Sequence, residues 1–283
     1  MNVQTLSVIV GGQACNATCP FCISRMTPNQ MTPKPPDVNW RRFETAIYVA
    51  RAHGATTMML TGKGEPTLSK DLISAYIRRN ARELPIVELQ TNGILLAGGK
   101  LDPDLAHWED HGLTTVALSI VHWDRQANEE IYGSSYEVRD LVKKLHDYGL
   151  SVRLSVTMLE GYVDGVSAVN QMINFAKSVD AEQLTLTPVN TPYKCDDQTA
   201  LWAKKHAVPP RVLDFYLPEF LHWHGTKLIT LPHGATIFDV DGQNVCLSNC
   251  LTPAVKDGTM RNLIFHPDGH LRFDWTHEGS ILL

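Results

Sequence analysis

The chain has 283 residues, of which 43% are hydrophobic and 19% are charged. These values are ordinary for a globular protein, which at this length buries most of its apolar surface and needs no covalent staples. The net charge is −5, so long duplex nucleic acid is not an expected partner, whereas a nucleotide or a short single strand fits. No apolar run approaches the ~20 residues of a membrane span, and the N-terminus lacks the pattern of a signal peptide, so we expect a cytoplasmic protein without membrane contact.

Short apolar runs alternate with helical stretches along the first two thirds of the chain. The predicted strands cover residues 7–10, 57–60, 86–90, 116–120, 152–157 and 184–187. After the first interval they begin about every 30 residues, which is the length of one βα unit. Strict alternation predicts a parallel sheet, curved or closed, with the active site at the C-terminal ends of its strands.

Helical periodicity fills the intervals between these strands. Two predicted helix faces consist of Trp40, Phe43, Ile47 and Ala50, and of Leu72, Ile73, Tyr76 and Ile77. The clearest helix is predicted to begin at Ser134, with Glu137 three residues later completing a capping box, and to end at Gly149. These helices supply the second layer of an α/β fold.

The pattern changes after residue 207. Pro209-Pro210 precedes a helical stretch rich in aromatic residues, and hairpin-turn signals follow at Asp241-Gly242 and at Pro267-Asp268-Gly269. We therefore expect residues 208–283 to form a small β-rich C-terminal extension that covers the active site.

Three of the six cysteines, Cys15, Cys19 and Cys22, follow the first predicted strand. A reducing compartment disfavours a disulfide, and zinc requires a fourth ligand from a distant part of the chain. A C-x-x-C after a strand is similar to the active site of a thioredoxin or glutaredoxin, so a thiol–disulfide or zinc-binding protein is one alternative. Such folds are much shorter and have no use for Cys15. Three thiolates on one loop suit a [4Fe–4S] cluster, because they leave its fourth iron open.

The spacing of these cysteines, with Phe21 just before the third, resembles the signature of the radical S-adenosylmethionine (SAM) superfamily. A second match follows the second predicted strand, where Gly62-Lys63-Gly64-Glu65-Pro66 is similar to the Gly-Gly-Glu-Pro motif of that family. Lys63 stands where the family has the first glycine of the pair. The resemblance implies a partial (β/α)6 TIM-type barrel over residues 1–207.

This resemblance also implies the cofactors. A [4Fe–4S] cluster would be held by Cys15, Cys19 and Cys22, and SAM would chelate its open iron. One electron, from a flavodoxin- or ferredoxin-type donor, would cleave SAM to a 5′-deoxyadenosyl radical. That radical would abstract hydrogen from a small-molecule, nucleotide or modified-base substrate. Peptide or protein modification, including activation of a glycyl-radical partner, is the second enzymatic alternative.

Further SAM contacts are implied residue by residue. The set consists of Phe21 near the adenine, Gly64 and Glu65 at the methionine amino group, Thr91 and Asn92 after the third strand, Ser119 on the fourth strand, and Arg153 at the methionine carboxylate. For Asn92, Ser119 and Arg153 a structural role, as a turn residue, a buried hydroxyl or a surface charge, is the alternative.

Three cysteines remain, namely Cys195, Cys246 and Cys250. Residues 262–272 resemble the hairpin of the twitch and SPASM extensions, which hold an auxiliary iron–sulfur cluster, but Phe273-Asp274-Trp275 lacks the cysteine that usually follows. The three cysteines are a possible second metal site, for a cluster or for zinc with a histidine; otherwise they are small buried hydrophobes.

Overall fold

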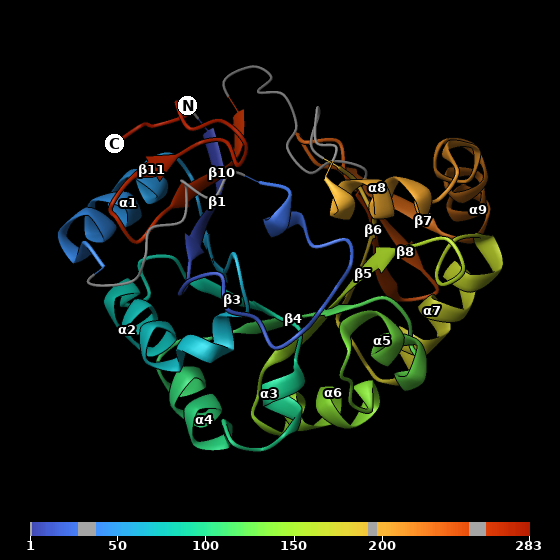
Figure 1. Cartoon of the computed structure of the whole chain (residues 1–283), viewed down its shortest axis with the longest axis horizontal. Coiled ribbons are helices and arrows are strands. Elements are labelled where there is room, and N and C mark those ends of the chain that lie inside the picture. Colours follow the sequence, from blue (N-terminus) through green and yellow to red (C-terminus); the bar gives the residue numbers. More distant parts are fainter. Residues whose placement is uncertain (1, 28–37, 192–196, 249–258) are drawn as a thin grey trace.

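The computed structural model describes residues 2–27, 38–191, 197–248 and 259–283. One sheet runs through these residues, in the strand order β11-β10-β1-β2-β3-β4-β5-β6-β9-β8-β7 (Figure 1). Its strands are β1 (Asn2–Ile9), β2 (Thr57–Thr61), β3 (Ile86–Thr91), β4 (Thr115–Ile120), β5 (Ser151–Met158), β6 (Gln183–Pro188), β7 (Thr226–Thr230), β8 (Thr236–Val240), β9 (Gln243–Leu247), β10 (Thr259–Phe265) and β11 (Leu271–Arg272). Strands β1 to β6 pair in parallel in chain order, which confirms all six predicted strands.

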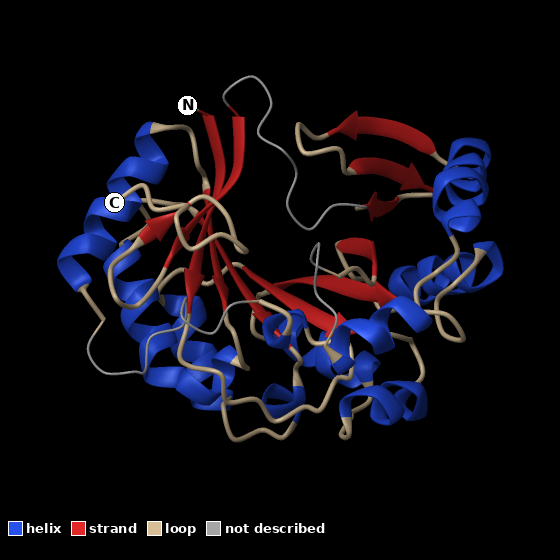
Figure 2. Ribbon diagram, turned by 45° about the horizontal axis from the view of Figure 1, so that its top comes forward, coloured by secondary structure: helices blue, strands red, loops and turns tan. Residues whose placement is uncertain are grey.

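Helices cover the convex side of this sheet (Figures 1 and 2). The helices of the described residues are α1 (Trp40–Ala52), α2 (Lys70–Asn80), α3 (Ile94–Ala97), α4 (Asp102–Asp110), α5 (Arg125–Tyr132), α6 (Val138–Asp147), α7 (Val166–Ser178), α8 (Gln198–Lys205) and α9 (Leu217–His224), with the 3-10 turns η1 (Ile23–Arg25) and η3 (Pro66–Ser69) and the π-helical turn η4 (Val212–Tyr216). Because each crossover helix returns the chain to the same end of the sheet, β1 to β6 all end at one edge.

The sheet curves into a partial barrel. Strand β10 pairs in parallel with β1 at one side, and β9 pairs in parallel with β6 at the other. Within the described residues, the outermost strands β11 and β7 are not paired with each other, so hydrogen bonds do not close the barrel. The strands of residues 208–283 thus extend the sheet at both edges; that this segment also covers the active site stays a prediction.

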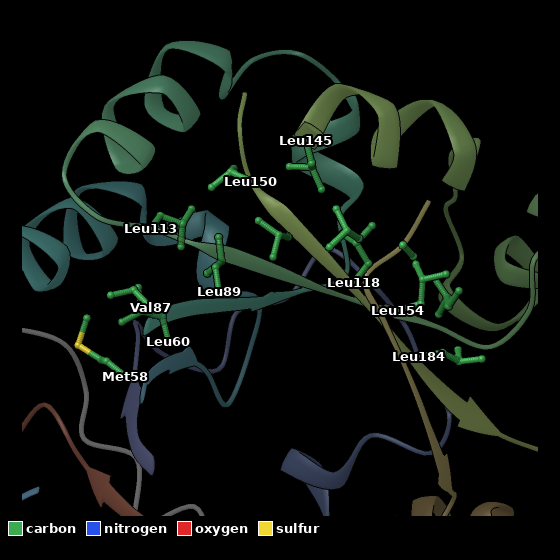
Figure 3. Close-up of a cluster of buried hydrophobic side chains, with 14 of the residues drawn as sticks. Met58, Leu60, Val87, Leu89, Leu113, Leu118, Leu145, Leu150, Leu154 and Leu184 are labelled. Atoms are coloured by element: carbon green, nitrogen blue, oxygen red, sulfur yellow. The ribbon is translucent and has the colours of Figure 1, made fainter. Parts of the chain in front are cut away.

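The two faces of the sheet differ in chemistry. In β5, buried side chains alternate with half-buried ones at every residue. Buried leucines of neighbouring strands, such as Leu89, Leu118 and Leu154, lie between the sheet and the outer helices (Figure 3). The opposite, inner face carries half-buried polar side chains, including Ser119 and Ser155. A tightly packed barrel core would be apolar, so this inner face is built to meet solvent or a ligand.

The predicted capping box at Ser134 is wrong. Helix α6 begins at Val138, its N-cap is Glu137, and no side chain caps it. The reason is tertiary: Tyr136, in the segment before the helix, is half-buried and packs against the core, and its ring lies close to Gly93. The predicted end is confirmed, since Gly149 follows the last turn with φ +76°.

Both predicted hairpin turns are confirmed. Asp241 and Gly242, between β8 and β9, have φ values of +49° and +85°, as a type I′ turn requires. Gly269, at φ +92°, lies in the turn between the antiparallel strands β10 and β11. The aromatic helical stretch is present as η4 and α9, but Phe215 and Trp223 are largely exposed. No helix in the described residues is long and apolar enough to cross a membrane.

The turn at Gly93 gives a test of the packing. Gly93 has φ +76°, and an added Cβ would overlap the Tyr136 ring and lie 2.9 Å from a Leu141 methyl. We expect Gly93→Ala to lower the free energy of unfolding by about 2 kcal/mol more than Gly161→Ala, because overpacking adds to backbone strain only at Gly93. Gly161 is the matched control, since it has φ +85° and no atom within 4 Å of the added Cβ. Urea denaturation measures both; equal losses would contradict the packing seen here.

Candidate active site

The cysteine loop, defined here as residues 13–27, leaves the C-terminal end of β1 and lies at the edge where β2 and β3 also end. Cys15 is exposed, whereas Cys19 and Cys22 are half-buried. The short turn η1 follows Cys22 directly. The loop therefore presents three thiols at the position that a parallel α/β sheet offers to ligands.

The first anchor of this loop is the turn after β2. The Glu65 backbone N–H donates to the Ala14 carbonyl at 2.9 Å. A Cβ on Gly64 would overlap the Ala14 carbonyl and lie 2.7 Å from the Gln13 carbonyl carbon. Gly64 is needed here because the two backbones touch. The contact of Gly64 with SAM stays a prediction.

A second anchor comes from the end of helix α5. Both the backbone N–H and the hydroxyl of Thr18 donate to the Tyr132 carbonyl, at 2.9 and 3.2 Å. The Phe21 ring packs against Tyr132 and Trp202, with ring centroids 6.4 and 6.1 Å apart. The Phe21 side chain thus ties the loop to α5 and α8, and its predicted place near the adenine stays a prediction.

Glu65 lies beneath the loop with 5% of its surface exposed. Its Oε1 accepts from the Thr67 N–H at 3.0 Å, the Thr67 hydroxyl at 2.7 Å and the Thr91 hydroxyl at 2.6 Å. Its Oε2 accepts from the Asn92 N–H at 2.9 Å. These four bonds stabilise a buried charge and join the ends of β2 and β3. The Glu65 side chain was predicted to bind a methionine amino group; only Oε2 retains room for that role.

Asn92 connects the end of β3 to the cysteine loop. Its side-chain amide donates to Asn16 Oδ1 at 2.7 Å and approaches Cys15 Sγ at 3.9 Å. Its Oδ1 accepts from the Ile94 N–H at 3.1 Å, so the orientation of the amide is fixed at both ends. Asn92 is thus a structural link as well as a predicted SAM contact.

The three thiols fit a cluster better than thiol exchange. Burial raises the pKa of Cys19 to about 12, and repulsion from Cys22 and Cys15 adds to the effect. Burial is also the main cause of the raised pKa of Cys15. A redox C-x-x-C needs a lowered pKa at its first thiol, and the raised pKa of Cys19 is the opposite of that activation. Charges from bound iron would instead compensate three thiolates that lie within electrostatic range of one another.

The number of thiols on the loop bears on the choice between a cluster and a single ion. Among the described residues, no three His, Cys, Asp or Glu side chains converge on a point that one metal ion would occupy. Zinc requires four ligands around one centre, whereas a cubane takes each thiolate on a different iron. Three thiols on one loop are a suitable donor set for an iron–sulfur cluster, and their role as its ligands stays a prediction.

Ser119 and Arg153, two of the predicted SAM contacts, lie on the inner face of the sheet. Both are far from the cysteine loop in the sequence. Ser119 on β4 is in register with Ser155 on β5, and Ser155 with Thr185 on β6. Arg153 forms an ion pair with Glu88 on β3, and Gln90 donates to the same Glu88 oxygen at 3.2 Å. Arg153 is thus not a surface charge; its contact with the methionine carboxylate stays a prediction.

The possible second metal site is only partly visible. Cys246 is half-buried on the inner face of β9, in register with Thr185. Cys195 and Cys250 lie outside the described residues. An auxiliary site at these three cysteines, and the twitch or SPASM likeness of the C-terminal extension, stay predictions.

Several site residues were not predicted from the sequence. Thr18 and Asn16 anchor the loop, and Lys63 reaches Thr27 at its far end. The role of Glu88 could have been predicted, because a carboxylate inside a buried strand requires a hydrogen-bonding or charged partner. The other contacts join segments far apart in the chain, so no local sequence pattern predicts them.

Comparison with known proteins agrees with this geometry. The family model for the radical SAM superfamily matches residues 9–175. The match covers more than half of the chain, so the chain belongs to the radical SAM superfamily and is an enzyme of that class. Membership implies SAM and a [4Fe–4S] cluster.

Two curated relatives are similar to part of the chain. The probable GTP 3′,8-cyclase of Sulfurisphaera tokodaii is 29% identical over 179 residues, 61% of this chain and 52% of that protein. The GTP 3′,8-cyclase of Haemophilus influenzae (strain 86-028NP) is 30% identical over 123 residues, 42% of this chain and 34% of that protein. The chain thus matches between a third and just over half of the length of these relatives.

Among solved structures, SuiB of Streptococcus suis has a TM-score of 0.63 and 14% identity, over 95% of this chain and 60% of SuiB. The structure of SuiB bound to SAM gives a TM-score of 0.58. At this identity the likeness shows the fold, and it confirms the partial TIM-type barrel.

The carboxylate of Glu65 gives a test of the site's construction. We expect Glu65→Gln to lower the free energy of unfolding by about 2 kcal/mol or more, because an amide replaces charge-assisted bonds and turns a donor toward other donors. Chemical denaturation of the metal-free protein measures the loss. The control is Glu83→Gln, whose side chain is about half exposed and pairs with Arg51, where we expect less than about 1 kcal/mol. Equal losses would contradict the four-donor arrangement.

Proposed function

We propose that this protein binds a [4Fe–4S] cluster through Cys15, Cys19 and Cys22, binds SAM at the C-terminal ends of β2 to β5, and acts on a nucleotide or a related polar small molecule. When bound, the cluster and SAM supply one-electron cleavage and a 5′-deoxyadenosyl radical that abstracts hydrogen.

The observation that carries this proposal is the way the cysteine loop is held. Its backbone is held at Ala14 by the turn after β2 and at Thr18 by the end of α5, and the Asn16 side chain is bound by Asn92 in the turn after β3. A loop fixed at several points keeps its three thiols in place before any metal arrives, as a preorganised site requires. A loop with only a structural role has no need of three unpaired thiols at the ligand edge of the sheet.

The remaining site residues have clear tasks in this proposal. Oε2 of Glu65 and the backbone of Gly64 would bind the methionine amino group of SAM. Ser119 and Arg153 on the inner face would contact the ribose and the carboxylate of SAM. The aromatic cluster of Phe21, Tyr132 and Trp202 excludes water from one side of the loop.

A nucleotide substrate is supported by two independent facts. The curated relatives that match the chain are named GTP 3′,8-cyclases. The inner face carries a row of half-buried polar side chains in register across β4, β5 and β6, namely Ser119, Ser155 and Thr185. Hydroxyls and the Glu88–Arg153 ion pair suit a ligand rich in hydrogen-bonding groups and disfavour an aliphatic one.

The electron must come from outside the chain. We propose a flavodoxin- or ferredoxin-type donor that approaches the loop near Cys15, which is the most exposed of the three thiols. An exposed thiol of this kind suits a reducing compartment, so we place the protein in the cytoplasm.

Reconstitution tests the cluster assignment. After anaerobic treatment with iron and sulfide, we expect about four irons per chain, since one cubane accounts for them. Addition of dithionite and SAM should then yield 5′-deoxyadenosine, measured by liquid chromatography. A colourless protein that does not cleave SAM would contradict the proposal.

The triple variant Cys15→Ala, Cys19→Ala, Cys22→Ala should retain no iron and produce no 5′-deoxyadenosine, while Cys246→Ala should retain about four irons. Iron that persists in the triple variant would assign a second cluster to Cys195, Cys246 and Cys250.

A nucleotide screen tests the substrate class. We expect a nucleoside triphosphate to accelerate 5′-deoxyadenosine formation above the rate with SAM alone, because a bound substrate consumes the radical productively. Ser155→Ala should then raise the KM for that nucleotide about threefold to tenfold, the value of one lost hydrogen bond. The control Ser167→Ala changes an exposed hydroxyl on α7 and should leave the KM unchanged. Acceleration by peptides and not by nucleotides would contradict the substrate class.

A further inference from the structure

Lys63 stands in the turn after β2, where the Gly-Gly-Glu-Pro motif of the family has a glycine. Its side chain does not extend into solvent: only 6% of its surface is exposed. Lysine is rarely buried to this extent without an anionic or hydrogen-bonding partner, because the desolvation of an ammonium costs several kcal/mol. The position of its ammonium is therefore informative.

That ammonium lies at the far end of the cysteine loop. Lys63 Nζ donates to the Thr27 hydroxyl at 2.6 Å, and the same hydroxyl lies 3.3 Å from the Ser24 carbonyl, to which it donates. Burial lowers the pKa of Lys63, and the nearby Cys22 thiol opposes that change. The lysine therefore reaches the segment that carries the third predicted ligand of the cluster.

A cation in this place acts on a redox cofactor through simple electrostatics. Reduction adds one negative charge to a cluster that already carries three thiolates. A fixed positive charge stabilises the reduced form more than the oxidised form, and it does so more strongly where water is excluded. Net charge and exposure are among the factors that set the potentials of iron–sulfur clusters.

We propose that Lys63 raises the reduction potential of the cluster held by Cys15, Cys19 and Cys22, and so lets a donor of moderate potential reduce it. This inference rests on the proposed function. Lys63 is a positioning and tuning residue; it does not ligate iron. The substitution of lysine for glycine in the motif then replaces a flexible turn residue with a buried charge beside the cofactor.

A second cation, Arg25, lies near the predicted cluster ligands and can be compared with Lys63. Arg25 on η1 interacts electrostatically with Cys19, but its side chain is exposed. Water and salt screen an exposed charge, so Arg25 should influence the potential much less than Lys63 does. Arg25 on the cysteine loop and Lys63 in the turn after β2 therefore separate the effect of a buried charge from the effect of charge alone.

The test is a redox titration of the reconstituted cluster, followed by electron paramagnetic resonance, without SAM. For Lys63→Gln and Lys63→Met we expect the ratio of reduced to oxidised cluster, at a fixed solution potential, to fall about tenfold, which for one electron is about 59 mV. Lys63→Arg should stay close to the wild type. Arg25→Gln should shift the ratio much less than Lys63→Gln.

Two variants separate charge from tethering. Lys63→Gln keeps a donor for Thr27 without the charge and is the milder change for folding, whereas Thr27→Val keeps the charge without the hydrogen bond. We expect a shift in Lys63→Gln and none in Thr27→Val. The reverse pattern would overturn the proposal and leave Lys63 a tether of the loop.

Iron content distinguishes the two levels of failure. A wild-type protein that binds no iron contradicts the proposed function itself. About four irons in the wild type and in Lys63→Gln, with equal potentials, overturns only the role of Lys63.

Discussion

The buried carboxylate of Glu65 joins the parts of the candidate active site. Four donors surround it, two from Thr67 in its own turn and two from Thr91 and Asn92 at the end of β3. A carboxylate removed from water is costly unless such bonds are made, so the turn cannot rearrange without a large loss. Because the Glu65 backbone also holds Ala14, the position of the cysteine loop depends on this carboxylate.

The parallel sheet explains why these parts meet. The loops after β1, β2 and β3 all leave the same edge, and the outer helices bury the apolar face of each strand (Figure 1). The inner face is left to polar side chains from β3 to β6. The curved sheet therefore has one edge for the proposed redox cofactor and one face for the proposed polar ligand, and Lys63 places its ammonium at the end of the cysteine loop.

The strands and the cysteine motif could be predicted because their signals are local. Apolar runs at regular intervals fix β1 to β6, and the spacing of Cys15, Cys19 and Cys22 needs only eight consecutive residues. The start of α6 could not be predicted, because the packing of Tyr136 against Gly93 overrides the local capping signal at Ser134. Contacts between segments far apart in the chain could not be predicted either, because they depend on tertiary packing and leave no local sequence pattern. The ion pair of Arg153 with Glu88 spans two strands that are not adjacent in the sheet.

The central claim is that the anchored loop holds a four-iron cluster at the C-terminal edge of the sheet, with SAM on its open iron. An anomalous scattering map at the iron edge, from crystals grown anaerobically with SAM, tests it most directly. We predict one cluster bonded to the sulfur atoms of Cys15, Cys19 and Cys22, with the amino and carboxylate groups of SAM on the fourth iron. A single metal ion on the loop, or a disulfide between Cys19 and Cys22 with no iron, would contradict it.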